Sequence, residues 1–259
     1  PYTILVVDDN PDMTDFLKRT FEGYFKRIII AGDGVEALQL VRSHVPDIIV
    51  SDVMMPRMNG YELCKTIKED IAISHIPVIL LTAKDDKQSL ISGYKNGADG
   101  YLSKPFEVEM LMELIRNRLK NREYTKKRYL NAGLIPTPEE STISLTDETF
   151  LIKLNSIIQE NIDNTNLGIQ FICQEVGLGR SSLYNKLKAL TGMGANEYIS
   201  KLRIEKAITL ISGTDMPFSE IAEKTGFTTP SYFSTTFKQY TGETPSQYKE
   251  RKKKGLTDQ

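Results

Sequence analysis

Five polar side chains stand at the ends of short apolar runs in the first half of the sequence. Asp52 ends one run, Asp8 and Asp9 follow another, and Thr82 and Lys104 mark the ends of two more. Together these residues offer three carboxylates, a hydroxyl and an ammonium. A carboxylate is a weak nucleophile, but a metal ion and an ammonium that withdraw charge from incoming phosphoryl oxygens allow it to attack in line.

The segments that must position these side chains alternate between two periodicities across residues 1–120. Short runs rich in β-branched residues predict strands, and the segments between them, with a period of 3.6 residues, predict helices. This alternation predicts a five-stranded parallel sheet covered by helices on both faces. The predicted strands are Ile4–Val7, Arg27–Ala31, Asp47–Val50, Pro77–Leu81 and Gly100–Leu102, and the predicted helices are Thr14–Phe25, Val35–Ser43, Tyr61–Lys68, Lys87–Asn96 and Val108 to about Arg122.

Ligands of such sheets bind beyond the carboxyl ends of the strands, so we expect all five polar side chains at one sheet edge. Three neighbouring carboxylates repel one another, and a bound cation removes the conflict. Oxygen donors with no histidine or cysteine beside them favour a hard ion such as Mg²⁺. We therefore predict a magnesium site in which Asp9 and Asp52 bind the metal and Asp8 binds it through water.

The same groups have predicted roles in phosphoryl transfer. Asp52 is the predicted nucleophile, Lys104 supplies the counter-charge, and Thr82 donates a hydrogen bond to the new phosphoryl oxygen. Pro105 indicates a constrained Lys104–Pro105 peptide that can be cis and that aims the lysine.

These residues lie in motifs that resemble the receiver domain of two-component response regulators. The resemblance covers residues 3–120, and its motifs are Val7-Asp8-Asp9-Asn10, Ser51-Asp52-Val53-Met54-Met55-Pro56-Arg57-Met58-Asn59-Gly60, Leu81-Thr82-Ala83-Lys84 and Lys104-Pro105-Phe106. It implies an α/β flavodoxin-like (βα)5 fold, a Mg²⁺ ion that also contacts the backbone carbonyl of Met54, and phosphorylation of Asp52 by a histidine kinase. It further implies that Thr82 and Tyr101 move inward together on phosphorylation and that the chain then forms a homodimer.

The second half of the chain contains an internal repeat of about 50 residues. The copies lie at residues 172–192 and 221–242, and one residue is inserted in the second. Each copy predicts a short helix, a turn at Gly177 or Gly226, and a second helix, which is the layout of a helix-turn-helix unit. A helix predicted over Ala195–Ile211 joins the copies. Recognition helices about 34 Å apart would meet successive major grooves on one face of duplex DNA.

The two predicted recognition helices carry polar residues suited to DNA. Arginine and asparagine pair bidentately with guanine and adenine edges, whereas lysines and hydroxyls more often hold phosphates. We therefore predict that Arg180 and Asn185 contact bases. The whole predicted set is Arg180, Ser181, Ser182, Tyr184, Asn185 and Lys188 on the first helix, and Thr229, Pro230, Ser231, Tyr232, Ser234, Thr235 and Lys238 on the second.

Residues 147–250 resemble the AraC/XylS-type DNA-binding domain. The resemblance rests on Gly226-Phe227, Ser231-Tyr232-Phe233-Ser234, Phe237-Lys238 and Thr241-Gly242-Glu243-Thr244-Pro245-Ser246-Gln247-Tyr248. It implies an all-α domain with two helix-turn-helix units that binds the major groove of double-stranded DNA. The first unit matches less closely than the second.

The sequence predicts four regions. A receiver at residues 1–122 is followed by a linker at 123–146, where Gly133, Pro136 and Pro138 interrupt a charged helical stretch. The tandem DNA-binding domain at 147–252 is followed by a tail at 253–259. The basic run at 251–254 either adds phosphate contacts or forms a solvated helix end.

Composition sets limits on location and partners. No run of 18 apolar residues occurs, so we predict no membrane contact and a cytoplasmic location. Cys64 and Cys173 lie in amphipathic helical patterns, which favour buried thiols over a disulfide, and His44 and His75 are too far apart to form a catalytic pair. Residues 1–120 hold 15 Lys+Arg against 18 Asp+Glu, and residues 151–259 hold 14 against 11, so the basic excess lies in the second half.

The sequence favours a transcription factor whose DNA binding is gated by phosphorylation of Asp52, with RNA polymerase as a further partner. An aspartyl-phosphate phosphohydrolase is one alternative, but such enzymes need Asp-x-Asp after a strand, and neither Asp8-Asp9 nor Asp52-Val53-Met54 provides it. A receiver that serves only as a dimerisation scaffold is another, and the presence of every phosphotransfer group argues against it.

The chain opens at Pro1 without a methionine and enters the first predicted strand almost at once. Receivers joined to this type of DNA-binding domain also occur at the C-terminal end of hybrid sensor histidine kinases. A hybrid parent protein and a trimmed chain are therefore both retained as interpretations.

Overall fold

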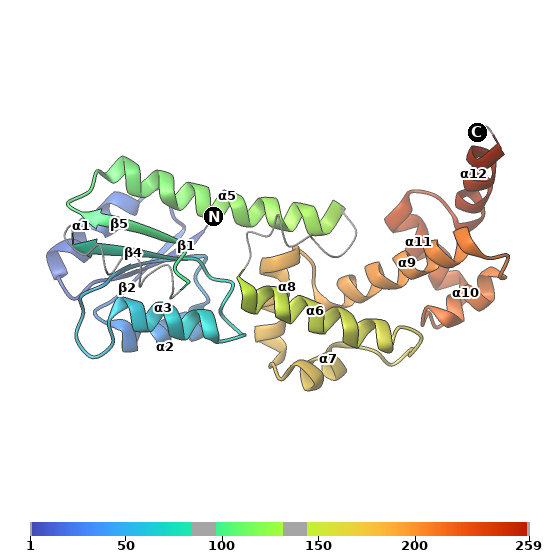
Figure 1. Ribbon diagram of the computed structural model, residues 1–259, viewed down its shortest axis with the longest axis horizontal. Helices are drawn as coiled ribbons and strands as arrows, with labels where there is room; N and C mark the ends of the chain where they lie inside the picture. The colour runs from blue at the N-terminus through green and yellow to red at the C-terminus, as the bar shows by residue number, and fades with distance from the viewer. Residues whose placement is uncertain (1, 84–96, 132–143, 258–259) are drawn as a thin grey trace. The chain divides into compact units, whose positions relative to one another are not determined.

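The computed structural model describes residues 2–83, 97–131 and 144–257 (Figure 1). The predicted helix at 87–96 and the middle of the predicted linker lie outside the described residues.

The described residues form two compact units. Unit 1 comprises the described residues up to Phe150 together with Asn185–Gly192. Unit 2 comprises Leu151–Tyr184 together with the described residues from Met193 onward.

Unit 1 contains the predicted parallel sheet. Its strands are β1 (Thr3–Val7), β2 (Arg27–Ala31), β3 (Ile48–Asp52), β4 (Val78–Ala83) and β5 (Gly100–Lys104). They lie in the order β2-β1-β3-β4-β5, and every neighbouring pair is parallel. The strand order reverses between β1 and β3, which is the place where ligands of such sheets bind.

Helices cover both faces of this sheet because successive apolar side chains along its strands point to opposite faces. The described helices on these faces are α1 (Pro11–Phe21), α2 (Gly34–His44), α3 (Gly60–Glu69) and α5 (Val108–Asn131). Along β1, Leu5 and Val7 pack with α2 and α3, whereas Ile4 and Val6 pack with α1 and α5. Figure 1 shows α2 and α3 on one side of the sheet and α5 on the other. The predicted flavodoxin-like architecture is confirmed.

The first helix begins and ends earlier than the periodicity predicted. It begins at Pro11, and the side chain of Asn10 caps its N-terminus. It ends at Phe21 because the chain turns at Gly23, whose φ is +84°. Phe25 nevertheless remains in the core, where its ring packs edge to face on Phe21 with 5.5 Å between the ring centroids.

The described residues from 144 onward form helices. These are α6 (Leu145–Glu160), α7 (Ile169–Val176), α8 (Arg180–Thr191), α9 (Ala195–Gly213), α10 (Phe218–Lys224), α11 (Pro230–Thr241) and α12 (Pro245–Thr257). The two predicted helix-turn-helix copies are α7 with α8 and α10 with α11. Their turns match, because Gly177 and Gly226 have φ values of 74° and 70°. A Cβ at Gly226 would also meet the carbonyl oxygen of Ile162 and the guanidinium of Arg203, so glycine is required there.

The second copy has an aromatic core within unit 2. Phe227, Phe233 and Phe237 pack in series, with ring centroids 5.3 Å and 5.7 Å apart, against buried residues of α9 and α10. In the first copy, Leu183 and Leu187 occupy the positions that match Phe233 and Phe237, and both are buried. The repeat read from the sequence is therefore a repeat of buried positions.

The predicted linker is partly helical. α5 runs through its first part to Asn131, and α6 begins at Leu145, just before the predicted start of the second domain. The predicted domain boundaries stay predictions. None of the helices in the described part of the chain combines the length and the apolar character needed to cross a bilayer.

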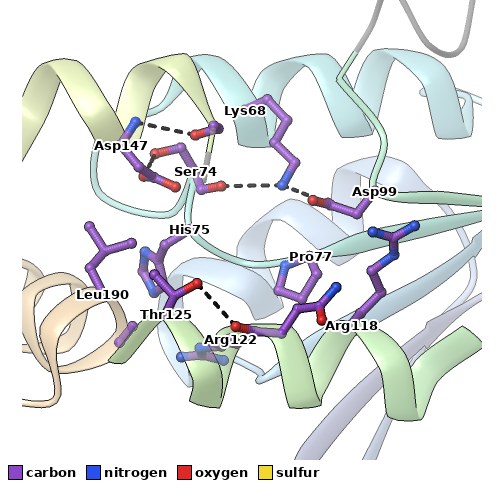
Figure 2. A pocket seen from close by; sticks show the side chains of 13 residues that line it. Lys68, Ser74, His75, Pro77, Asp99, Arg118, Arg122, Thr125, Asp147 and Leu190 are labelled. Carbon is purple, nitrogen blue, oxygen red and sulfur yellow. Dashed lines mark hydrogen bonds and ion pairs between the residues drawn. The ribbon is translucent and has the colours of Figure 1, made fainter. Parts of the chain in front are cut away.

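Unit 1 also contains a partly open pocket of about 80 Å³ (Figure 2). His75 lines it, is 8 % exposed, and has no hydrogen-bond partner for either ring nitrogen among the described residues. Burial, followed by the positive charges of Arg122 and Lys186, lowers the pKa of His75 to about 3. The negative charge of Asp147 raises this pKa, and the positive charge of Lys68 lowers it further. The net lowering means that the imidazole is neutral in the folded protein.

A neutral buried His75 should make unit 1 less stable in acid. The unfolded chain, with an ordinary histidine pKa of 6.5, binds more protons than the folded protein between pH 6.5 and about pH 3. His75 therefore does not reduce the free energy of unfolding above pH 6.5. Below that pH the free energy of unfolding falls, by about 2 kcal/mol between pH 6.5 and pH 5. We predict that His75→Leu removes this part of the pH dependence, as measured by urea denaturation.

The matched control for this prediction is His44→Leu, because the side chain of His44 is exposed. If His75→Leu keeps the full pH dependence of the unmodified chain, the account of His75 is wrong.

Candidate functional site

The strand ends bring three of the predicted polar side chains into contact. Asp8 follows β1, Asp52 ends β3, and Lys104 ends β5. The ammonium of Lys104 lies 2.5 Å from Asp52 Oδ1 and 2.9 Å from Asp8 Oδ2. Because the two carboxylates are only 3 % and 8 % exposed, the shared ammonium is what offsets their mutual repulsion.

Lys104 is held in its charged form. Desolvation of the ammonium opposes its charge, but hydrogen bonds to Asp52 and Asp8 outweigh this effect and raise the pKa of Lys104 above its ordinary value. The Lys104–Pro105 peptide is cis, in agreement with the constraint that Pro105 indicated.

Backbone amides bind the remaining oxygens of the two carboxylates. Met54 N donates to Asp52 Oδ2 at 2.7 Å, and Asn10 N donates to Asp8 Oδ1 at 2.9 Å. Together with Lys104, these amides give each of the four carboxylate oxygens a partner. A carboxylate that is held on both oxygens keeps one orientation, which favours attack by Asp52 along a fixed direction.

Asp9 does not join this group. Its side chain is exposed, and no set of three acidic, histidine or cysteine side chains within the described ranges is arranged to hold a metal ion. The structure therefore brings Asp8 and Asp52 together and leaves Asp9 beside them at the surface.

The two predicted switch residues lie on neighbouring strands. Thr82 is 5 % exposed near the end of β4, one residue beyond the Leu81 that pairs with Asp52. Tyr101, on β5, pairs with Leu80 of β4 and packs, partly buried, against the core on the α2 and α3 side of the sheet. Their movement on phosphorylation stays a prediction.

The loop that follows Asp52 is fixed by contacts that the sequence analysis missed. Arg57 forms an ion pair with Asp33, and Gly34 N donates to Met58 O at 3.2 Å. Asp33 also caps α2, because its Oδ1 accepts hydrogen bonds from two amides in the first turn. An aspartate directly before a helical pattern is an N-cap signal, which could have identified Asp33 but not its partner.

The predicted DNA contacts on α8 lie mostly at the surface. Arg180, Ser181, Tyr184 and Lys188 are exposed, and Ser182 and Asn185 are half-buried. Leu183 and Leu187 are buried on the other side of the helix. The helix therefore presents a polar face that is available to a partner.

The predicted contacts on α11 follow the same pattern. Thr229, Pro230, Ser231, Tyr232, Thr235 and Lys238 are exposed, and Ser234 is half-buried. Thr229 is also the N-cap of α11, because its Oγ1 accepts a hydrogen bond from Tyr232 N at 3.1 Å. The distance of about 34 Å between the two recognition helices stays a prediction.

One residue of α8 was overlooked in the sequence. Lys186 is fully buried, although lysine is rarely found inside proteins. It stands three residues after Leu183 and four before Leu190, so helical periodicity places it on the buried side. That spacing could have revealed it.

Comparisons with known proteins match both halves of the chain. A family model described as "Response regulator receiver domain" matches residues 4–116, and one described as "Helix-turn-helix domain" matches residues 172–251. The chain is 41 % identical over 249 residues to Histidine kinase P4 of Formosa agariphila, a match that covers 96 % of this chain and 18 % of that protein.

Two further relatives are regulators by name. Over 130 residues the chain is 37 % identical to the DNA-binding response regulator MtrA of Mycolicibacterium smegmatis, covering 50 % of this chain and 56 % of that protein. Over 165 residues it is 36 % identical to the response regulator MprA of a Mycobacterium species, strain KMS, covering 59 % and 70 %. The chain thus spans about a fifth of the Formosa protein and about half of MtrA.

The fold, the site and these matches define a receiver followed by a helix-turn-helix domain of the AraC type. The chain belongs to the response regulators. Neither of the two matching family models describes an enzyme.

Gly60, at the start of α3, packs closely against the backbone of Asp52. A Cβ at this position would meet the carbonyl oxygen of Asp52 and would lie 3.0 Å from the Cα of Val53. Because backbone atoms cannot rotate away, the strand end that carries Asp52 would have to move. We predict that Gly60→Ala slows phosphorylation of Asp52 by acetyl phosphate and Mg²⁺ by about 100-fold, measured by intact-protein mass spectrometry.

Gly32→Ala is the control for this substitution, because its Cβ would meet only the side chain of Glu36, at an ordinary 3.6 Å. A Gly60→Ala chain that is phosphorylated as fast as Gly32→Ala would contradict the requirement for close packing.

Proposed function

We propose that Asp52 accepts a phosphoryl group from a histidine kinase and that this phosphorylation controls sequence-specific binding to double-stranded DNA. The observation that carries the proposal is the fixed carboxylate of Asp52, held by Lys104 Nζ at 2.5 Å and by Met54 N at 2.7 Å. The similarity to Histidine kinase P4 over 96 % of this chain supports a histidine kinase as phosphodonor, within a larger hybrid parent protein.

The donor chemistry of the site suits Mg²⁺, because its donors are all oxygens. Asp8, Asp9, Asp52 and the backbone carbonyl of Met54 would hold the ion once the exposed side chain of Asp9 turns toward the other two carboxylates. Three carboxylates and the ammonium of Lys104 leave a net charge of two negatives, which a divalent cation neutralises. When bound, Mg²⁺ would withdraw charge from the phosphoryl oxygens.

The chain's own residues would carry out the transfer. A carboxylate oxygen of Asp52 forms the new bond to phosphorus as the bond between phosphorus and the donor nitrogen breaks. Lys104 stabilises the charge on the transferred group, and the hydroxyl of Thr82 donates a hydrogen bond to a phosphoryl oxygen. Movement of Thr82 would leave room for Tyr101 to turn inward. The chain acts as a phosphoryl acceptor and not as an enzyme on a small substrate.

The partners follow from these two surfaces. We propose that Arg180 and Asn185 contact base edges in the major groove, and that Lys188, Lys238 and the hydroxyl groups of both helices hold phosphates. Because its partner is DNA, the chain would act in the cytoplasm. A homodimer formed on phosphorylation and contact with RNA polymerase belong to the same proposal.

Asp52→Asn removes the nucleophile with almost no change in side-chain size. We predict that acetyl phosphate and Mg²⁺ add one phosphoryl group to the unmodified chain and none to Asp52→Asn, and that the variant shows no phosphodonor-dependent change in DNA affinity. Asp47→Asn, directly before the start of β3, is the control and should still be phosphorylated. An adduct on Asp52→Asn would refute the assignment, whereas an adduct without any change in DNA affinity would favour the dimerisation scaffold.

Base contacts and phosphate contacts should respond differently to substitution. We predict that Arg180→Ala costs about 1–3 kcal/mol on the preferred sequence and little on other sequences. Lys238→Ala should weaken binding to all sequences and reduce the slope of log affinity against log salt by about one. Fluorescence anisotropy with DNA selected from a random pool measures both, and an equal loss on all sequences for Arg180→Ala would remove it from the base contacts.

A further inference from the structure

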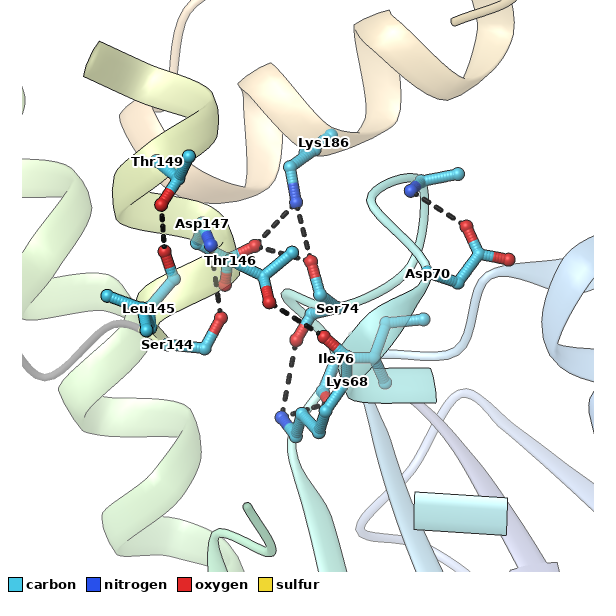
Figure 3. Close-up of polar contacts among 11 residues, drawn as sticks. Lys68, Asp70, Ser74, Ile76, Ser144, Leu145, Thr146, Asp147, Thr149 and Lys186 are labelled. Atoms are coloured by element: carbon cyan, nitrogen blue, oxygen red, sulfur yellow. Dashed lines mark hydrogen bonds and ion pairs between the residues drawn. The ribbon is translucent and has the colours of Figure 1, made fainter. Parts of the chain in front are cut away.

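Three polar side chains form a buried cluster in unit 1 (Figure 3). Lys186 Nζ lies 2.5 Å from Asp147 Oδ1 and 2.8 Å from Ser74 Oγ, and Ser74 Oγ donates to the same oxygen of Asp147 at 2.7 Å. Lys186 and Ser74 are fully buried, and Asp147 is 3 % exposed. We call these three residues the Lys186 cluster.

The cluster contains a charged pair. Burial alone would raise the pKa of Asp147, but the charge and hydrogen bond of Lys186 and the hydrogen bond of Ser74 outweigh burial and lower it. The ring of Phe150 lies 5.0 Å from the ammonium and adds a cation–π contact. A buried ion pair loses much of its compensation if either partner shifts, so it permits few arrangements of the elements that carry it.

Lys186 has no counterpart in the second helix-turn-helix copy. The position that matches it, 50 residues later, is Thr236, which is 4 % exposed and bears no charge. Lys186 is also not placed to contact DNA, because it lies on the buried side of α8. The predicted contacts Arg180, Tyr184 and Lys188 lie on the exposed side. A helix-turn-helix unit therefore does not need a lysine at this position to fold or to present its polar face.

Polar contacts lead from the Lys186 cluster to the two strands that carry the predicted switch residues. The carbonyl oxygen of Ser74 accepts from Lys68 Nζ at 3.3 Å, and Lys68 forms an ion pair with Asp99 at 2.7 Å. The Asp99 carboxylate accepts from Val78 N, at the start of β4, at 2.7 Å. Asp99 also stands directly before β5, two residues ahead of Tyr101.

The first turn of α6 binds the same region. Thr146 Oγ1 donates to the carbonyl oxygen of Lys68 at 2.9 Å, next to the bonds that Asp147 makes. Figure 3 shows the side chains of Lys186, Asp147 and Ser74 pointing toward one another, with Lys68 below them. A shift of β4 or β5 therefore changes the position of Ser74 and of the partners that bind it.

We propose that Lys186 is a positioning residue that makes the placement of α8 depend on the state of the phosphoacceptor sheet, through Asp147 and Ser74. The proposal rests on phosphorylation-controlled DNA binding and extends it, since it names the side chains that couple the two events. Lys186 itself touches neither the phosphoryl group nor DNA. Its effect is on the ratio of DNA affinities in the two phosphorylation states.

The test measures this ratio in the full chain. The dissociation constant for duplex DNA selected by the phosphorylated chain from a random pool is compared with and without acetyl phosphate and Mg²⁺. For the unmodified chain we expect the two constants to differ by about 5-fold to 150-fold, the usual range of such coupling. In Lys186→Met/Asp147→Leu, which removes both charges and so leaves no unpaired buried ion, we expect the ratio to approach one while the chain remains folded and phosphorylated.

Ser74→Ala provides an independent variant, because it keeps the ion pair and removes only the hydroxyl that links it to the loop before β4. We expect the ratio to move toward one in this variant as well. The matched control is Lys201→Met/Glu205→Leu, which removes an ion pair of a largely buried lysine on α9. This control should keep the ratio of the unmodified chain.

The outcomes separate the two proposals. A ratio of one in the unmodified chain, despite phosphorylation of Asp52, overturns phosphorylation-controlled DNA binding itself. A normal ratio in the unmodified chain that persists in both Lys186→Met/Asp147→Leu and Ser74→Ala overturns only the role of the Lys186 cluster.

Discussion

One ammonium between two buried carboxylates is the interaction on which the receiver site depends. Without Lys104, Asp8 and Asp52 would face each other as like charges with little water between them, and nothing within the described residues would offset their repulsion. With it, each carboxylate has a counter-charge and a fixed orientation. The parallel sheet makes this arrangement accessible, since β1, β3 and β5 all end on the same edge. A chemical site thus follows from strand direction together with three residues, two aspartates and one lysine.

Much of this could be predicted because it depends on local periodicity. The strands, the order of polar residues at their ends and the matching glycines of the repeat all lie in short segments of sequence. The exposed position of Asp9, the pair of Arg57 with Asp33, and the partners of Lys186 could not be predicted in this way. Strand direction brings Asp9 to the sheet edge but does not fix which way its side chain faces. The other two depend on partners from other elements: Arg57 pairs with Asp33, and Lys186 binds a residue 112 positions away and another 39 positions away.

The second half of the chain shows the same division between local and distant information. The turns at Gly177 and Gly226 and the buried residues beside them are fixed by short patterns, and they recur with little change. The choice of residue in each core is less regular. Leucines fill the interior of the first copy at the positions where the second has phenylalanines, so the two helices pack with different shapes behind similar polar faces.

The difference between Lys186 and Thr236 has a consequence for how separable the two copies are. The second copy has the uncharged Thr236 at the position of Lys186, and its aromatic core is completed by helices next to it in the chain. The first copy carries inside it a cation whose counter-ion, Asp147, is supplied from α6, well before the copy begins. A fragment that held only the second copy would contain no buried ion at this position. A fragment that held only the first copy would bury the ammonium of Lys186 without its counter-ion. Duplicated modules in this protein have therefore ceased to be interchangeable parts.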